Sequence, residues 1–109
     1  MPPLTRRQKI EAMLAEQPGD SFLKYGLALE LEKEGDHDRS LTLHGELTRL
    51  SPPYVPAFLM SAQQLVKLTR VNEARAMLRT GIEAARAQGN AHAASEMAEL
   101  LASLGVLGD

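Results

Sequence analysis

Apolar residues recur along most of the chain at the three- and four-residue spacing that is typical of amphipathic helices. Ile10, Met13 and Leu14, for example, form one such stripe near the start. Glycine, proline and short polar clusters separate the stripes, as they commonly do between helices. The pattern predicts an all-α fold of six helices, over residues 5–17, 21–34, 37–50, 55–68, 71–88 and 91–104.

Several of the predicted helix ends carry residues that are suited to capping. Thr5 is expected to cap the first helix, and Asp20 or Ser21 the second, because their side-chain oxygens can accept hydrogen bonds from free backbone amides. Gly35 is expected to end the second helix, since glycine adopts the left-handed conformation of a C-terminal cap at little cost. Gly105 is expected to end the sixth helix.

The predicted helical hairpin between residues 18 and 52 is followed by a second hairpin that aligns with it after a shift of 34 residues. Pro18 and Pro52 are 34 residues apart, and Ala28 and Ala62 have the same separation. A fixed period of this size that contains two helices indicates an array of stacked hairpins. A six-helix bundle without repeats is the alternative.

In this frame, residues 21–54 and 55–88 resemble two full repeats of the tetratricopeptide repeat (TPR) family, which has small residues and a proline at fixed positions. The residues that carry the resemblance are Ala28, Ser40 and Pro52 in the first repeat and Ala62, Ala74 and Gly81 in the second. The residues that depart from the family pattern are Lys24, His44, Leu47, Thr69 and Arg86.

The resemblance implies a small bacterial-type member of the family, with residues 1–109 as a single domain. Helix 5–17 resembles the second helix of a preceding half-repeat, and helix 91–104 resembles the first helix of a following one. The six helices would then stack as three hairpins in a right-handed α-α superhelix.

Composition narrows the class of protein further. A net charge of −2 argues against a general nucleic-acid partner, because nucleic-acid-binding proteins usually carry a basic excess. No apolar run approaches the roughly 20 residues needed to cross a bilayer, so no membrane partner is expected. The absence of cysteine is compatible with a reducing compartment, and a cytoplasmic location is expected.

The polar residues do not form a pattern that is typical of catalysis. His44 is expected to be a hydrogen-bonded residue of the interior, because it occupies a repeat position that usually faces inward. The acidic residues near Asp36 and His37 lack the spacing of a metal site, because Glu30, Glu32 and their neighbours point to different sides of a helix. No phosphate-binding loop or nucleophile motif is present. We therefore expect no enzyme activity, no cofactor and no metal.

The resemblance also implies a concave groove lined by the first helix of each repeat. The groove residues that it implies are Phe22, Tyr25, Leu29, Lys33, Leu59, Met60, Gln63, Val66 and Lys67. The first hypothesis is an interaction or scaffold module that binds a peptide or a partner helix there, with Lys33 and Lys67 meeting an acidic group. The alternative is a structural protein that uses the same surface to form a homodimer or to hold one fixed subunit.

Overall fold

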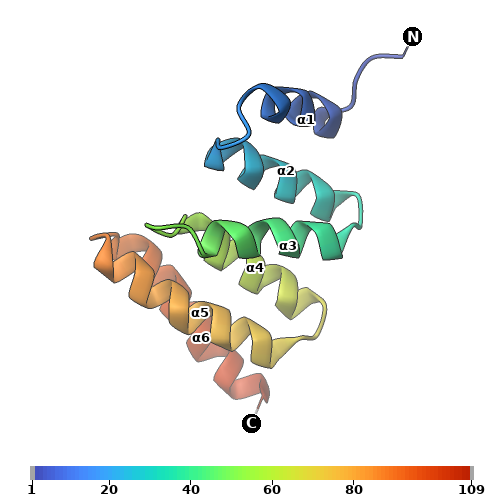
Figure 1. The fold of residues 1–109 in the computed structure, drawn as a ribbon. Coiled ribbons are helices and arrows are strands. Elements are labelled where there is room, and N and C mark those ends of the chain that lie inside the picture. The colour runs from blue at the N-terminus through green and yellow to red at the C-terminus, as the bar shows by residue number, and fades with distance from the viewer. Residues whose placement is uncertain (1, 109) are drawn as a thin grey trace. The chain divides into compact units, whose positions relative to one another are not determined.

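In the computed structural model, which describes residues 2–108, the chain forms six α-helices and those residues contain no strand (Figure 1). The helices are α1 (Arg6–Glu16), α2 (Ser21–Lys33), α3 (His37–Thr48), α4 (Pro56–Lys67), α5 (Val71–Ala87) and α6 (Ala91–Gly108). All bounds but the last lie within two residues of those predicted. The predicted all-α fold of six helices, packed sequentially as hairpins, is confirmed.

The predicted end of the sixth helix at residue 104 is wrong, because α6 continues through Gly105 to Gly108. Gly105 does not have the positive φ of a C-terminal cap. A glycine inside a helix costs only about 1 kcal/mol relative to alanine. The residues that follow, Val106 and Leu107, include no helix breaker, so the helix does not end at Gly105.

Both predicted N-terminal caps are present. The Thr5 hydroxyl accepts a hydrogen bond from the Gln8 amide at 3.1 Å, and the Gln8 side chain accepts one from the Thr5 amide at 2.9 Å. Asp20 caps α2 by accepting from the amide of Leu23 at 3.0 Å. These bonds satisfy amides that have no partner within the helix.

Three helices end in the same kind of turn, with one residue in the left-handed conformation. The residues are Gly35 after α2 (φ 83°), Thr69 after α4 (φ 59°) and Gly89 after α5 (φ 72°). The amide of the following residue donates to the carbonyl five residues earlier, as from Asp36 to Leu31 at 2.9 Å. The positive φ expected of Gly35 is therefore observed.

The chain divides into two compact units between Leu47 and Thr48. The first contains α1, α2 and nearly all of α3, and the second contains α4, α5 and α6. The expectation of one domain over residues 1–109, with full repeats at 21–54 and 55–88, stays a prediction.

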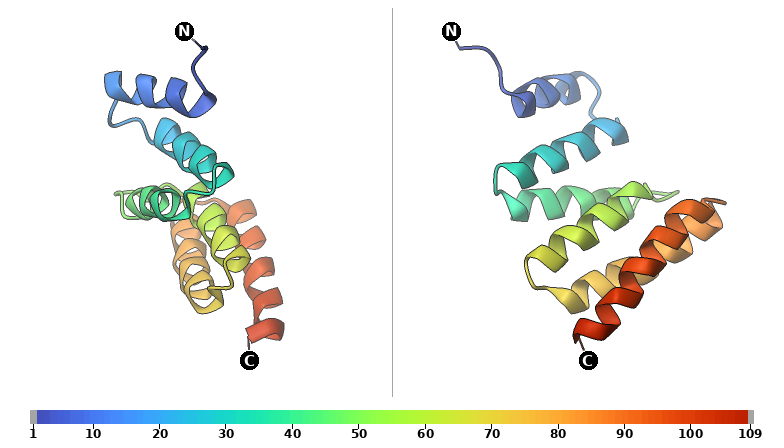
Figure 2. Two further views of the ribbon diagram at one scale, coloured as in Figure 1. Left: turned by 90° about the vertical axis from the view of Figure 1, so that its right-hand side faces the viewer. Right: turned by 180° about the vertical axis from the view of Figure 1, so that it is seen from behind.

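In the first unit the three helices follow one another as neighbours (Figures 1 and 2). The small residues Ala28 and Ser40 are both fully buried. The Ser40 hydroxyl donates a hydrogen bond to the Ala28 carbonyl at 2.6 Å, and this bond links α3 to α2. Leu27, Leu31 and Leu47 also belong to the aliphatic interior of this unit.

In the second unit, α5 packs against both α4 and α6. Gly81 lies at the point of closest approach: a Cβ atom there would be 2.6 Å from the Cβ of Phe58 and 2.6 Å from the Sδ of Met97. Phe58, Leu78 and Met97 are buried around it. The small residue predicted at position 81 is thus required by the packing of three helices.

None of the helices formed by residues 2–108 combines the length and apolar character needed to span a bilayer.

Candidate functional site

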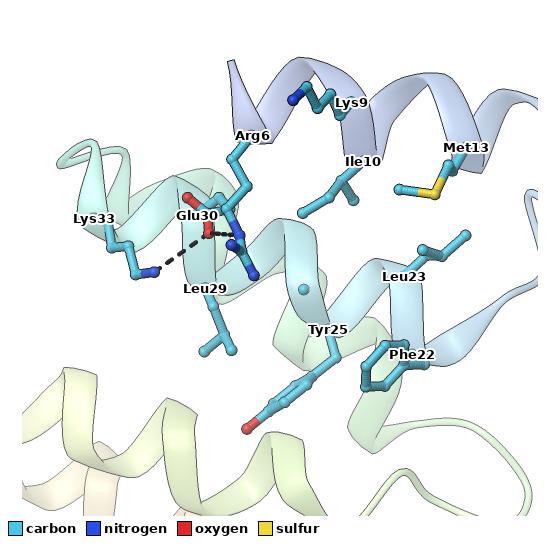
Figure 3. Close-up of a pocket in the computed structure, with 11 residues that line it drawn as sticks. Arg6, Lys9, Ile10, Met13, Phe22, Leu23, Tyr25, Leu29, Glu30 and Lys33 are labelled. Atoms are coloured by element: carbon cyan, nitrogen blue, oxygen red, sulfur yellow. Dashed lines mark hydrogen bonds and ion pairs between the residues drawn. The ribbon is translucent and has the colours of Figure 1, made fainter. Parts of the chain in front are cut away.

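A hollow of about 580 Å³ opens on the first unit, across the exposed faces of α1 and α2 (Figure 3). We call it the α1–α2 groove. Its apolar lining residues are Ile10, Met13, Phe22, Leu23, Tyr25, Gly26 and Leu29. Its charged lining residues are Arg6, Lys9, Glu30 and Lys33. In Figure 3, Ile10 and Met13 approach from α1, whereas Phe22, Tyr25 and Leu29 project from α2.

Two large apolar side chains in the groove are unusually exposed. Phe22 is 71% exposed and Met13 is 48% exposed. Single exposed apolar residues are normal on protein surfaces, but neighbouring ones around a hollow are typical of an interaction site. Neither residue contributes much to the interior, so both remain available to a partner.

The charged side chains form a rim that is mainly positive. Glu30 is 13% exposed at its side chain and pairs with two cations, the Arg6 guanidinium at 2.9 Å and the Lys33 ammonium at 3.3 Å. Figure 3 shows both ion pairs, with Arg6 reaching from α1 to α2. Lys9 forms no ion pair within residues 2–108. The groove therefore has three cations and one carboxylate, which pairs with two of them.

Gly26 leaves room between α1 and α2. A Cβ atom at this position would meet only the Cδ1 of Ile10, at an ordinary contact distance of 3.7 Å. The packing of the two helices therefore does not require glycine here, unlike at Gly81. The absence of a side chain instead widens the groove next to Ile10.

The predicted groove residues are divided between the two units. Phe22, Tyr25, Leu29 and Lys33 line the α1–α2 groove together. The others lie on α4 in the second unit: Leu59, Met60 and Val66 are half-buried, and Gln63 and Lys67 are exposed. They do not line the α1–α2 groove.

The lining residues from α1 are not among those that the sequence predicted. The spacing of Ile10 and Met13 indicates a packing stripe, and the first helix resembles the outer helix of a half-repeat. The apolar spacing alone carries no signal of this exposure, and Met13 is in fact 48% exposed. The basic residues Arg6 and Lys9 belong to the same exposed side of the groove.

His44 is fully buried in α3, as predicted, but it is not hydrogen-bonded. Neither ring nitrogen has a partner among residues 2–108. Its ring lies edge-on to the ring of Tyr25, with centroids 5.8 Å apart and an angle of 61° between the planes. Burial lowers the pKa of His44 to about 4, because the charged form would lose its hydration. The expectation of a hydrogen-bonded histidine is therefore wrong.

A second, smaller hollow of about 390 Å³ lies between α5 and α6. Arg75 is buried beside it and donates to the Asn72 side chain at 2.8 Å and to the Leu104 carbonyl at 2.7 Å. These bonds attach α6 to α5, which gives Arg75 a structural role. Over residues 2–108, no cluster of three or more histidine, cysteine, aspartate or glutamate side chains could hold a metal ion.

Comparison with known proteins agrees with this architecture. Two solved structures are similar, each described as a tetratricopeptide repeat domain protein from Salinibacter ruber. The solution structure is 31% identical, with a TM-score of 0.75, and the match covers 80% of this chain and 88% of that one. The crystal structure is also 31% identical, with a TM-score of 0.72, and the match covers 81% of this chain and 98% of that one.

No family model matches the sequence, and no curated protein matches it either. The sequence identity and the coverage of the two solved structures are nevertheless high enough to show the family. The chain belongs to the tetratricopeptide repeat family. The resemblance indicated by the 34-residue period is thereby confirmed.

Proposed function

We propose that this protein is a non-enzymatic interaction module that binds a peptide or a partner helix through the first helix of each repeat. Tetratricopeptide repeats generally mediate protein–protein interactions. The observation that carries the proposal is the α1–α2 groove, where Phe22 and Met13 remain exposed beside a rim of cations. The residues of α4 named above are proposed as a further contact set.

The same surface could instead join two copies of the chain. In a two-fold dimer through the α1–α2 groove, the same patch of both subunits meets itself. Arg6, Lys9 and Lys33 would then approach their own counterparts, and like charges across an interface disfavour association. We therefore place the binding of a different protein first and homodimer formation second.

The proposal is tested by selecting binders from a displayed peptide library and measuring their affinities for variants in solution. Phe22→Ala is expected to weaken binding by about tenfold or more, because exposed aromatic side chains are frequent hot spots. The matched control is Leu50→Ala, which removes an apolar side chain that is 40% exposed and lines neither cavity. Circular dichroism should show unchanged helicity for both variants.

Two outcomes would contradict the proposal. If no peptide is enriched and the protein remains a monomer at all concentrations, the chain is not an interaction module of this kind. If Phe22→Ala and Leu50→Ala bind the selected peptides as tightly as the wild type, binding occurs at another surface. A concentration-dependent mass in sedimentation would favour the homodimer.

A further inference from the structure

We infer that the partner segment of the α1–α2 groove is an acidic amphipathic helix, with its apolar stripe against Met13 and Phe22 and its carboxylates against the basic rim. The inference rests on the proposed function and adds the chemistry of the partner. It follows from three features of the groove: its charge, its exposed apolar residues and its small number of uncharged polar groups.

The charge of the groove favours a negative partner. Arg6 and Lys33 share the single carboxylate of Glu30, at 2.9 and 3.3 Å, and both side chains remain largely exposed. Lys9 has no ion pair within the described residues. This positive excess is local, since the whole chain has a net charge of −2. Such a patch speeds the association of a complementary partner and repels a basic one.

The lining of the groove favours a helix over an extended strand. The amides and carbonyls in the middle of α1 and α2 already bond within their own helices. No asparagine, glutamine, serine or threonine side chain lines the groove among residues 2–108. Apart from the charged side chains, only the Tyr25 hydroxyl could bond to the backbone of an extended peptide. Such a peptide would lose water along its length and gain few hydrogen bonds in return. A helix brings its backbone bonds with it and needs only an apolar stripe, as in other helix-in-groove complexes.

The arrangement of the lining residues also fits this partner. Met13 and Phe22 lie at one end of the groove, whereas Arg6 and Lys33 lie toward the other (Figure 3). Anchors at i, i+3, i+4 and i+7 of a helix would contact the apolar end, and acidic residues on the flanks would reach the cations. Gly26 widens the hollow beside Ile10, where an apolar anchor can enter.

The test uses three fluorescein-labelled amphipathic peptides of about four helical turns each, with the same leucine stripe. Their flanking residues are glutamate, glutamine or lysine. In anisotropy titrations with the full chain, the glutamate peptide is expected to bind at least about tenfold more tightly than the glutamine peptide, and the lysine peptide most weakly. The preference for glutamate should decrease as salt is added, because the charges of the rim are exposed.

Charge variants of the protein locate the effect. Lys9→Glu should remove most of the preference for the glutamate peptide, and Lys33→Gln should reduce it. Both positions are exposed, so folding should be retained. The matched control is Arg86→Glu, which reverses an exposed charge on α5 that lines neither cavity and should leave all three affinities unchanged.

Equal affinity of the wild type for the glutamate and glutamine peptides would overturn the inference about charge. Binding of library peptides that are not helical when bound would overturn the inference about the helix. In both cases the proposed interaction module would still stand. A sedimentation mass that rises with concentration without peptide, and that Phe22→Ala returns to the monomer value, would instead show that a second copy occupies the groove. That result would overturn the inference as a whole.

Discussion

Within residues 2–108, Thr69 is the one residue other than glycine with a positive φ, and its turn is of the same kind as those at Gly35 and Gly89. Its φ of 59° matches the role of Gly35, which lies 34 residues earlier and has a φ of 83°. A β-branched residue in this conformation is strained, by about 1–3 kcal/mol. Thr69 departs from the residue pattern of the family. The structure shows that the turn nevertheless keeps the same geometry, with Thr69 in a strained conformation.

Replacing Thr69 with glycine should therefore stabilise the protein. We expect the free energy of unfolding of Thr69→Gly to rise by about 1 kcal/mol, because the strain is relieved and little else changes. The hydrogen bond that is lost is the local one from the Thr69 hydroxyl to the Leu68 carbonyl at 2.6 Å. Urea unfolding measures the difference, and the reverse control Gly35→Thr should destabilise. A lower midpoint for Thr69→Gly would show that the turn is not strained.

His44 should make stability depend on pH. Its pKa is about 4 in the folded protein and about 6.5 in the unfolded chain, so the unfolded state binds the proton first as the pH falls. Stability is therefore complete above pH 6.5 and is lost between about pH 6.5 and 4. The loss between pH 7 and 5 is expected to be about 2 kcal/mol.

Urea unfolding of the wild type and of His44→Leu at both pH values isolates this effect. The leucine variant has an apolar side chain at the buried position and no group there that titrates. It should therefore lose much less stability between pH 7 and 5. The same pH dependence in both proteins would mean that His44 is not the responsible group.

At the scale of the elements, small residues determine how closely the helices approach. Gly81 lets α5 contact both Phe58 of α4 and Met97 of α6, whereas a Cβ atom added at Gly105 would meet no other atom within 4 Å. Two glycines in helices of the same unit thus have opposite roles. This difference depends on the neighbours of each residue and cannot be read from the local sequence.

The two glycines give a matched pair of substitutions. Gly81→Ala should cost about 1–3 kcal/mol, because the new methyl group overlaps the Cβ of Phe58, which cannot move without its helix. Gly105→Ala should be neutral or stabilise by up to about 1 kcal/mol, through helix propensity alone. Thermal and urea unfolding measure both. Equal stability of the two variants would contradict the packing described for the second unit.

The helix boundaries could be predicted because most of them carry local signals. Thr5, Asp20 and Gly35 act at short range, through bonds to the nearest turn of the helix. The end of α6 was missed because Gly105 has the residue type of a cap without the conformation. The exposure of α1 was missed because it depends on which neighbours cover the helix, which the apolar spacing does not reveal.

At the scale of the whole molecule, the repeat period predicted the family, and four of the eleven residues that line the α1–α2 groove followed from it. Phe22, Tyr25, Leu29 and Lys33 were predicted from repeat positions and do line one groove. Their individual roles differ, because Tyr25 also packs against the buried ring of His44, whereas Phe22 is mostly exposed. Truncation of Phe22 therefore tests binding more cleanly than truncation of Tyr25.

The most direct test of the proposed interaction surface is a nuclear magnetic resonance titration of the ¹⁵N-labelled protein with the glutamate peptide. If the α1–α2 groove is that surface, the largest chemical-shift changes will fall on amides of α1 and α2, around Ile10, Phe22 and Gly26. The changes should be lost in Phe22→Ala and retained in Leu50→Ala. Changes confined to α3 and α5, with α1 and α2 unaffected, would contradict the proposal.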